Sequence, residues 1–289
     1  MNIVSVSERQ LKKMPELQIG SVVSTEGKLY VYDYKNKWQH NKELIKIYYN
    51  QKENYMADKI NVISQLLANK KYLDMPEVVL PSSLVAVDKK ISGYSMPWIE
   101  QNVNLSILLN NPKVSLYQKV RLLKDIYHIL DKLMNIKPLE DKFFLGDIHE
   151  ANFIIDLKEQ IIKVIDIDSA YINNGYIGIS KFLTFNDNLY DLPSKYPMNE
   201  DDRPIPNKNT TNLCFIYMLL NALSGATDVY RWSLEQFYNY MSYLSKKGMP
   251  QDLVDLFIKI YEPTKDNNLN IEMLDEIDVQ KDFSLKRML

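Results

Sequence analysis

Short segments in which apolar and polar residues alternate dominate the first third of the chain. This alternation, rich in β-branched and aromatic residues, is typical of β-strands that bury one face. It predicts strands at residues 19–24, 28–34, 43–49, 78–87 and 93–98. Apolar residues at helical spacing predict a helix at residues 52–68, and residues 4–15 form a polar lead-in with weak helical character. We therefore expect a small antiparallel sheet with one helix in residues 1–100.

Helical spacing dominates the remaining part, residues 101–289. It predicts helices at residues 105–109, 116–134, 212–223, 234–244 and 253–261. Two apolar runs, residues 152–155 and 161–165, flank a polar turn and predict a β-hairpin. Residues 173–209 show no periodicity, which predicts a functional loop or lid. The chain is thus predicted to be an α+β protein in two parts, with a boundary near residues 99–104.

Carboxylate and amide side chains gather at the outer ends of the predicted hairpin. Asp147 and Asn152 come just before its first strand, and Asp166 and Asp168 end or follow its second strand. Because a hairpin brings its outer ends together, these side chains should converge on one small region. Carboxylate, amide and phosphate oxygens are the ligands that Mg²⁺ prefers, so a magnesium site is expected there.

Composition and charge narrow the class of protein. The chain has 289 residues, of which 46% are hydrophobic and 25% charged, as in ordinary globular proteins. Its net charge of −2 provides no general attraction to nucleic acid or to an anionic membrane. A single cysteine, Cys214, excludes a disulfide framework within the chain. With no apolar run long enough to span a bilayer, we expect a cytoplasmic protein that binds neither membrane nor nucleic acid.

Lys46 lies inside the predicted strand at residues 43–49, between Ile45 and Ile47. Two readings of this lysine are open from the strand alone. Its side chain is either a buried or half-buried cation, or it points to solvent from the polar face of an alternating strand.

The order of these motifs resembles the protein-kinase-like superfamily over roughly residues 22–225. An aspartate followed five residues later by an asparagine, Asp147 and Asn152, resembles the catalytic loop of that superfamily. The second half of the hairpin resembles its metal-binding D-F-G segment, with Asp166 at the aspartate and Asp168 at the glycine. The I-D-x-D-S ending is most similar to divergent bacterial or phage-type Ser/Thr kinase-like proteins.

Residues 1–100 carry weaker parts of the same resemblance. Glu26 and Gly27 match the E-G-x-V-Y part of a phosphate-covering loop, and Lys46 matches the lysine that pairs with ATP. Residues 96–100 fall where the inter-lobe hinge would lie. The main chain around Met96, Trp98 and Ile99 would then meet the adenine ring.

The resemblance implies a bilobal fold with a small sheet lobe and a larger helical lobe, and a phosphotransferase that uses ATP and Mg²⁺. Asp147 would orient the acceptor hydroxyl, and Asn152 and Asp166 would hold Mg²⁺. Lys46 would pair with the α- and β-phosphates. Asp168 would be either an extra metal ligand or a cap of the following segment.

Several points of this reading stay open at the level of sequence. The acceptor would be a Ser/Thr hydroxyl of a protein substrate, or a small molecule, as the sequence around His149 also suggests. His149 itself would either contact the transferred phosphate or brace its loop. No glutamate in the helix at 52–68 is a clear partner for Lys46, and Asp58 or Glu53 would serve. Because the nucleotide loop is also poor in glycine, the alternative is a pseudokinase scaffold that acts by binding partners.

Overall fold

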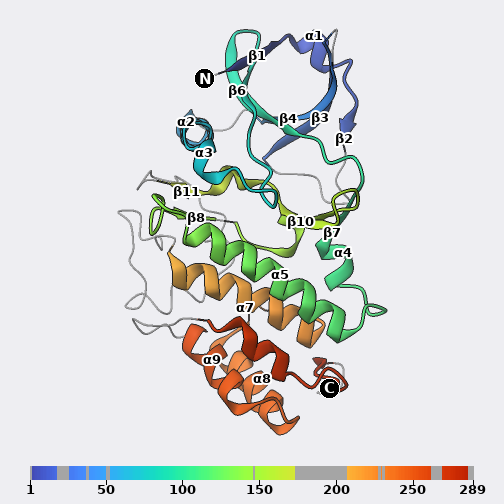
Figure 1. The fold of residues 1–289 in the computed structure, drawn as a ribbon, viewed down its shortest axis with the longest axis vertical. Coiled ribbons are helices and arrows are strands. Elements are labelled where there is room, and N and C mark those ends of the chain that lie inside the picture. The colour runs from blue at the N-terminus through green and yellow to red at the C-terminus, as the bar shows by residue number, and fades with distance from the viewer. Residues whose placement is uncertain are drawn as a thin grey trace.

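A curled six-stranded sheet forms one end of the molecule, and a stack of helices forms the other (Figure 1). The computed structural model describes residues 2–17, 26–36, 39–49, 53–145, 147–172, 207–226, 229, 232–261 and 269–285. The predicted strand at 19–24 and most of the predicted loop at 173–209 lie outside these ranges. The α+β prediction is confirmed, since an antiparallel-rich sheet and a set of helices make up the described chain.

The large sheet has the strand order β1-β5-β6-β4-β3-β2. Its strands are β1 (Ile3–Val6), β2 (Glu16–Leu17), β3 (Gly27–Asn36), β4 (Gln39–Tyr48), β5 (Ser83–Val87) and β6 (Lys90–Pro97). All neighbours pair antiparallel except β1, which runs parallel to β5. β1 and β2 lie at opposite edges, and the short helix α1 (Glu8–Leu11) connects them. The N-terminal segment therefore covers both edges of the sheet, where unpaired strands would otherwise be exposed.

Strand β4 is buried on both of its faces, and this decides the position of Lys46. Ile45 and Ile47 pack with Val6, Leu11 and Val85 in a core inside the curl of the sheet. Because side chains alternate along a strand, Lys46 points to the opposite face. There it is only 5% exposed, so the solvent-facing reading of Lys46 is wrong and the buried-cation reading is confirmed.

Two glycines let the neighbouring strands approach β4 very closely at Lys46. A Cβ atom on Gly93 of β6 would lie 1.9 Å from the carbonyl oxygen of Lys46, and one on Gly27 would lie 2.3 Å from that of Ile47. Both contacts are far shorter than atoms tolerate. Gly27 thus serves strand packing around the lysine, and its role beside phosphate stays a prediction.

Replacing Gly93 by alanine should lower the free energy of unfolding by about 1–3 kcal/mol, because the added methyl group forces β4 and β6 apart. Chemical denaturation of the variant measures this change. Gly225 is the matched control, since its φ of 70° strains an alanine while nothing lies within 4 Å of the added Cβ atom. Gly225→Ala should therefore lose only about 1 kcal/mol, the penalty for left-handed backbone. Equal losses in both variants would contradict the steric account.

The second strand-rich region consists of two small sheets beneath the large one. The hairpin strands β9 (Phe153–Asp156) and β10 (Ile161–Val164) form a three-stranded sheet with β7 (Asn102–Asn104). Strands β8 (Phe143–Phe144) and β11 (Tyr171–Ile172) form a two-stranded sheet. Helix α2 (Glu53–Ala68) contacts β5, β6 and β11, and α3 (Lys70–Leu73) follows it.

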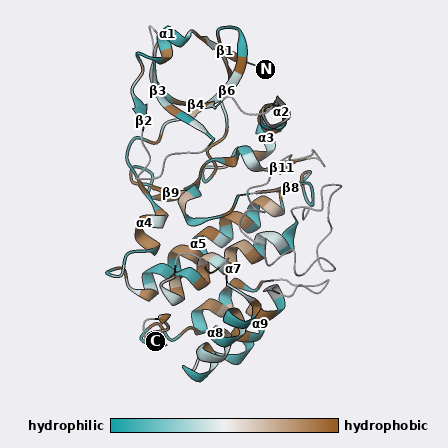
Figure 2. Cartoon of the chain, turned by 180° about the vertical axis from the view of Figure 1, so that it is seen from behind, coloured by the Kyte–Doolittle hydropathy of each residue, from teal (hydrophilic) through white to brown (hydrophobic). Residues whose placement is uncertain are grey.

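The helical end is organised around α7, which is buried over almost its whole length. Its helices are α4 (Leu105–Leu109), α5 (Leu116–Met134), α7 (Lys208–Ser224), α8 (Leu234–Lys246) and α9 (Gln251–Tyr261), followed by the 3₁₀ helix η5 (Ile271–Glu276). Figure 2 shows brown and teal residues together on α5, as expected for a helix with one buried face. Within the described ranges, no helix combines the length and apolar character needed to cross a membrane.

Most predicted elements are present, and the differences have local causes. The predicted strand at 78–87 begins only at Ser83, because Pro81 cannot donate a ladder hydrogen bond, and Val78 makes an isolated bridge to Val164 instead. The polar lead-in forms strand β1 as well as helix α1, so its description as weakly helical was incomplete. Strand β7 was not predicted, because three residues are too few to show alternation.

Candidate functional site

The hairpin predicted from sequence is confirmed and brings the expected side chains to one end. Phe153 of β9 pairs with Val164 of β10, so the residues just outside this pair are neighbours. The main-chain N–H of Ile165 donates to the carbonyl of Asn152 at 2.9 Å. Asn152 therefore lies beside Ile165, the residue that follows β10 and precedes Asp166.

Hydrogen bonds hold the loop before β9 in a defined shape. The side-chain amide of Asn152 donates to the carbonyl of Asp147 at 2.9 Å, and the main-chain N–H of Ala151 donates to Nδ1 of His149 at 3.2 Å. From outside the loop, the Asn104 amide donates to the Ala151 carbonyl at 2.7 Å. Asn104, the last residue of the predicted boundary at 99–104, also caps helix α4 and so links α4 to the loop.

His149 braces the loop, as one of its two predicted roles required. Its Nε2 lies 3.5 Å from Oδ1 of Asp147, whose side chain is only 7% exposed. Burial opposes the charged imidazolium, but the hydrogen bond and charge of Asp147, with the charges of Glu150 and Asp166, outweigh it and raise the pKa of His149. The hydrogen bond from the Ala151 N–H favours the neutral imidazole instead, because Nδ1 can accept it only when it carries no proton. A contact of His149 with phosphate stays a prediction.

Lys46 joins the sheet to the end of the hairpin through buried ion pairs. Its ammonium group donates to Oδ1 of Asp166, to Oδ2 of Asp168 at 2.7 Å and to Oε2 of Glu26 at 3.3 Å. Burial opposes the charge on Lys46, but the carboxylates of Asp166 and Asp168 outweigh it and hold the pKa of Lys46 well above its ordinary value. The hydroxyl of Tyr48 adds a further hydrogen bond to Asp168 at 2.7 Å.

A second buried lysine, Lys59 of helix α2, was not identified from the sequence. Its ammonium group lies 2.7 Å from Oδ1 of Asp168, 3.5 Å from Oε1 of Glu26 and 2.7 Å from Oγ of Ser169. Burial again opposes the charge, yet Asp168 and Glu26 raise the pKa of Lys59. Lys59 was detectable, because residues 59, 62, 63 and 66 recur at the spacing of one buried helical face.

The predicted acidic partner of Lys46 on helix α2 is corrected by these contacts. The carboxylates that reach Lys46 come from Glu26, Asp166 and Asp168. Asp58 lies next to Lys59 but is half-buried and makes no ion pair with Lys46. The side chain of Glu53 lies outside the described part of the structure. Helix α2 thus contributes a positive charge, that of Lys59, to these ion pairs.

The charged cluster, formed by Glu26, Lys46, Lys59, Asp166 and Asp168, holds two positive and three negative charges. Asp168 is fully buried and lies between both lysines, which depress its pKa against the effect of burial. Asp166 keeps a third of its side chain exposed (34%), and burial together with the charge of Asp168 raises its pKa despite Lys46. Of these two aspartates, Asp166 is therefore the one whose negative charge is less well compensated by the lysines.

These contacts bear on the two roles considered for Asp168. Both of its oxygens accept hydrogen bonds from ammonium groups, and Oδ2 also accepts from Tyr48. Little lone-pair capacity is left for a metal ion, and the role of a simple helix cap does not describe a carboxylate between two lysines. In this arrangement Asp168 is the central anion of the cluster, and its coordination of a metal ion stays a prediction.

Asp166 has a strained backbone. Its φ of 56° and ψ of 46° place it in the left-handed region, which is uncommon outside glycine, although asparagine and aspartate adopt it more often than other residues. Such a conformation costs about 1–3 kcal/mol and is commonest at functional sites, where surrounding contacts enforce it. Here it turns the chain from β10 into the 3₁₀ helix η2 (Ile167–Ser169), so that Asp166 and Asp168 both reach Lys46.

A magnesium ion at this place would be held by Asn152 and Asp166 together with a ligand. Within the described ranges, no three His, Cys, Asp or Glu side chains gather as a metal-binding group. The side-chain nitrogen of Asn152 already donates to the Asp147 carbonyl, which leaves its side-chain oxygen as a possible ligand. The exposed side of Asp166 can offer a second oxygen. Mg²⁺ is commonly bound by one or two protein oxygens together with substrate phosphates and water.

Residues 96–101 connect the large sheet to β7 and α4. Some of their main-chain groups already make hydrogen bonds within the protein. The N–H of Trp98 donates to the Lys42 carbonyl at 3.4 Å, and the carbonyl of Ile99 accepts from the Asn102 side chain at 2.6 Å. Met96 is buried, 7% exposed, and pairs with Leu44 of β4. An adenine contact in this segment therefore has to use other main-chain groups.

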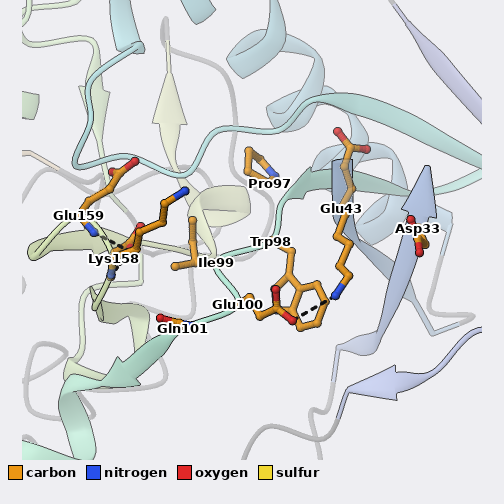
Figure 3. Close-up of a pocket in the computed structure, with 11 residues that line it drawn as sticks. Asp33, Glu43, Pro97, Trp98, Ile99, Glu100, Gln101, Lys158 and Glu159 are labelled. Carbon is orange, nitrogen blue, oxygen red and sulfur yellow. Dashed lines mark hydrogen bonds and ion pairs between the residues drawn. The ribbon is translucent and has the colours of Figure 1, made fainter. Parts of the chain in front are cut away.

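A separate open groove of about 930 Å³ lies beside this connecting segment. Figure 3 shows Trp98 and Glu100 in its middle, with Asp33 and Glu43 at one end and Lys158 and Glu159 at the other. None of the five cluster residues lines it, and neither does Asp147 or Asn152. The charged cluster, where the buried ionisable groups are, is therefore the candidate functional site.

The chain matches no known family model, and it matches no curated protein.

Proposed function

We propose that this chain is an ATP- and magnesium-dependent phosphotransferase with a bilobal, protein-kinase-like fold. The observation that carries the proposal is the ion pair between Lys46 of the sheet and Asp166 at the end of the hairpin. It joins the two parts of the chain that the resemblance assigns to the small and large lobes, residues 1–100 and 101–289. A buried lysine next to a strained, partly exposed aspartate is the pair of groups needed to place ATP phosphates and their metal ion.

Each side chain has a defined part in the proposed reaction. Asp147 accepts a hydrogen bond from the acceptor hydroxyl and takes up its proton as the acceptor oxygen bonds to the γ-phosphorus of ATP. The bond from that phosphorus to the β-phosphate oxygen breaks, and ADP leaves. Lys46 neutralises the α- and β-phosphates, and Asn152 and Asp166 hold Mg²⁺, which would supply charge neutralisation at the phosphates when bound. His149 holds the Asp147 loop in place through its contacts with Asp147 and Ala151.

The acceptor is a Ser/Thr hydroxyl of a protein in this proposal, with a small-molecule hydroxyl as its variant. The alternative function is a pseudokinase scaffold that works through partner binding. One observation favours the scaffold: Lys46 already donates to three carboxylates, so phosphates have to compete with them. The Asp166 carboxylate can leave Lys46 for a metal ion, because it is the most exposed member of the cluster.

MgATP should raise the melting temperature of the wild-type protein and have little effect on Asp166→Asn. At ATP concentrations of roughly 100 times Kd, binding stabilises the folded state by about 2.7 kcal/mol. A thermal melt with MgATP, Mg²⁺ alone and ATP with a chelator measures the effect and its dependence on the metal. Asp33→Asn, a change of an exposed strand aspartate outside the cluster, is the matched control and should respond like wild type.

Two outcomes would count against the proposal. If wild type and Asp166→Asn gain the same stability from MgATP, Asp166 does not hold the nucleotide-bound metal. If wild type gains none and transfers no phosphate, the scaffold is the better description.

A further inference from the structure

We propose that Lys59 is a positioning residue for Lys46: it occupies two carboxylates that would otherwise hold the Lys46 ammonium group away from the nucleotide. The inference rests on the proposed function, because it concerns how Lys46 is presented to ATP phosphates. It assigns a role to a side chain that neither the sequence motifs nor the resemblance singled out.

The geometry shows a closed ring of alternating charges, which we call the charge ring: Lys46, Asp168, Lys59 and Glu26. Asp168 uses Oδ2 for Lys46 and Oδ1 for Lys59, both at 2.7 Å. Glu26 likewise uses Oε2 for Lys46 at 3.3 Å and Oε1 for Lys59 at 3.5 Å. Each carboxylate thus bridges the two ammonium groups, and the four charges sum to zero.

All four side chains of the charge ring are buried, so the balance of charges matters strongly. Glu26, Lys46 and Lys59 are 5%, 5% and 3% exposed, and Asp168 is 0% exposed. In such an environment a charge that loses its partner is expensive, and neighbouring groups move to compensate it. Without Lys59, both carboxylates would have Lys46 as their remaining lysine partner within the ring.

That change would act directly on the nucleotide-binding group. Lys46 would be drawn toward Glu26 and Asp168, and would be less able to contact phosphates beside Asp166. Lys59 therefore leaves Lys46 available by sharing the two carboxylates with it. Lys59 comes from α2, Lys46 from β4, and Asp168 from η2, while Glu26 lies just before β3. The ring therefore also connects the helix, the sheet and the segment that follows β10.

The polarity of the ring argues against an acid at this point of helix α2 as the partner of Lys46. A carboxylate at position 59 would face Asp168 and Glu26 at contact distance and would repel both. Asp58, the neighbouring acid on α2, is half-buried and has no ion pair with Lys46. The two readings therefore predict opposite effects for changes at positions 58 and 59.

Steady-state phosphoryl transfer by Lys59→Met, Asp58→Asn and wild type tests the proposal, with ATP hydrolysis as the assay when no acceptor is supplied. Lys59→Met keeps the length of the side chain but removes its charge. We expect its KM for MgATP to rise about tenfold or more, the effect of one lost charge-assisted hydrogen bond, with a smaller change in kcat. Asp58→Asn should keep the wild-type KM.

A double variant separates positioning from a merely structural role. Glu26→Gln combined with Lys59→Met removes one negative and one positive charge, so Lys46 and Asp168 again balance each other. We expect the double variant to fold better than Lys59→Met and to recover most of the KM for MgATP. A steric role of Lys59 would give no such recovery, and the double variant remains informative if Lys59→Met alone does not fold.

The outcomes are distinguishable. An unchanged KM in Lys59→Met, a raised KM in Asp58→Asn, or a double variant no better than the single one would each overturn the role of Lys59 while leaving the phosphotransferase proposal intact. A wild-type protein that neither binds MgATP nor turns it over would overturn both proposals together.

Discussion

Replacing Asp147 by asparagine should lower the rate of phosphoryl transfer by about 10²–10⁴-fold and leave MgATP binding close to that of wild type. This range is the usual contribution of a positioned general base. The Asp147 side chain is nearly buried and lies 3.5 Å from His149. Asparagine has the same size, so the loop should keep its shape while it loses the group that accepts the proton.

Single-turnover phosphoryl transfer, measured together with the MgATP-induced shift in melting temperature, checks both halves of this expectation. Glu150→Gln is the matched control, because it removes a half-buried carboxylate from the same loop. That variant should transfer phosphate nearly as fast as wild type. Wild-type turnover by Asp147→Asn would remove Asp147 from its role, and loss of MgATP binding would indicate that the substitution had disturbed the site itself.

The hairpin and most of the helices were predictable because their signals are local. The two apolar runs around residues 156–160 set the ends of β9 and β10, and their register places Asn152 near Asp166 without further information. Helices α4 and α5 likewise begin and end as predicted, at residues 105–109 and 116–134, since side-chain caps at Asn104 and Ser115 mark where they begin.

Contacts between distant segments were not predictable in the same way. Strand β1 pairs with β5 across about 80 residues, and nothing in four residues of sequence indicates that partner. The burial of Lys46 depended on the second core inside the curled sheet, which buries the face of β4 that holds Ile45. From the strand alone, either face could have been the wet one.

The charge ring brings together residues that the resemblance singled out, through contacts that the resemblance did not indicate. Glu26 and Lys46 were both placed at the nucleotide site by their motifs, yet nothing in the motifs indicates that Glu26 contacts Lys46. The resemblance also directed attention to acids on α2, whereas the buried face of that helix carries Lys59. Helical periodicity would have been the better guide here, because it depends on packing and needs no assumption about charge.

The two aspartates that follow β10 have opposite relations to stability, although both contact Lys46. Asp168 is enclosed by Lys46, Lys59 and Tyr48 and satisfies the cluster. Asp166 adds the third negative charge in a left-handed conformation. A residue that costs stability and keeps one side exposed is expected at a ligand site, whereas a residue that satisfies two buried lysines is expected to hold the site together.

Asp168→Asn should therefore lower the free energy of unfolding at pH 7 by about 3–5 kcal/mol, because it leaves two buried lysines with one anion fewer. Asp166→Asn, the matched control, should be as stable as wild type or more stable, since asparagine tolerates the left-handed backbone and removes the excess charge. Urea unfolding of the three proteins at pH 7 measures both differences.

The free energy of unfolding should also depend on pH in opposite directions through the two aspartates. The folded-state pKa of Asp168 is depressed below its unfolded value of about 3.9, so its contribution is complete above that pH and is lost as the pH falls toward the folded pKa. The folded-state pKa of Asp166 is raised, so its stabilising contribution is complete below the unfolded pKa and is lost as the pH rises through the folded pKa. On acidification, Asp168→Asn should thus approach wild type from below and Asp166→Asn from above. A loss of equal size in both variants at pH 7 would show that the two aspartates share one structural role.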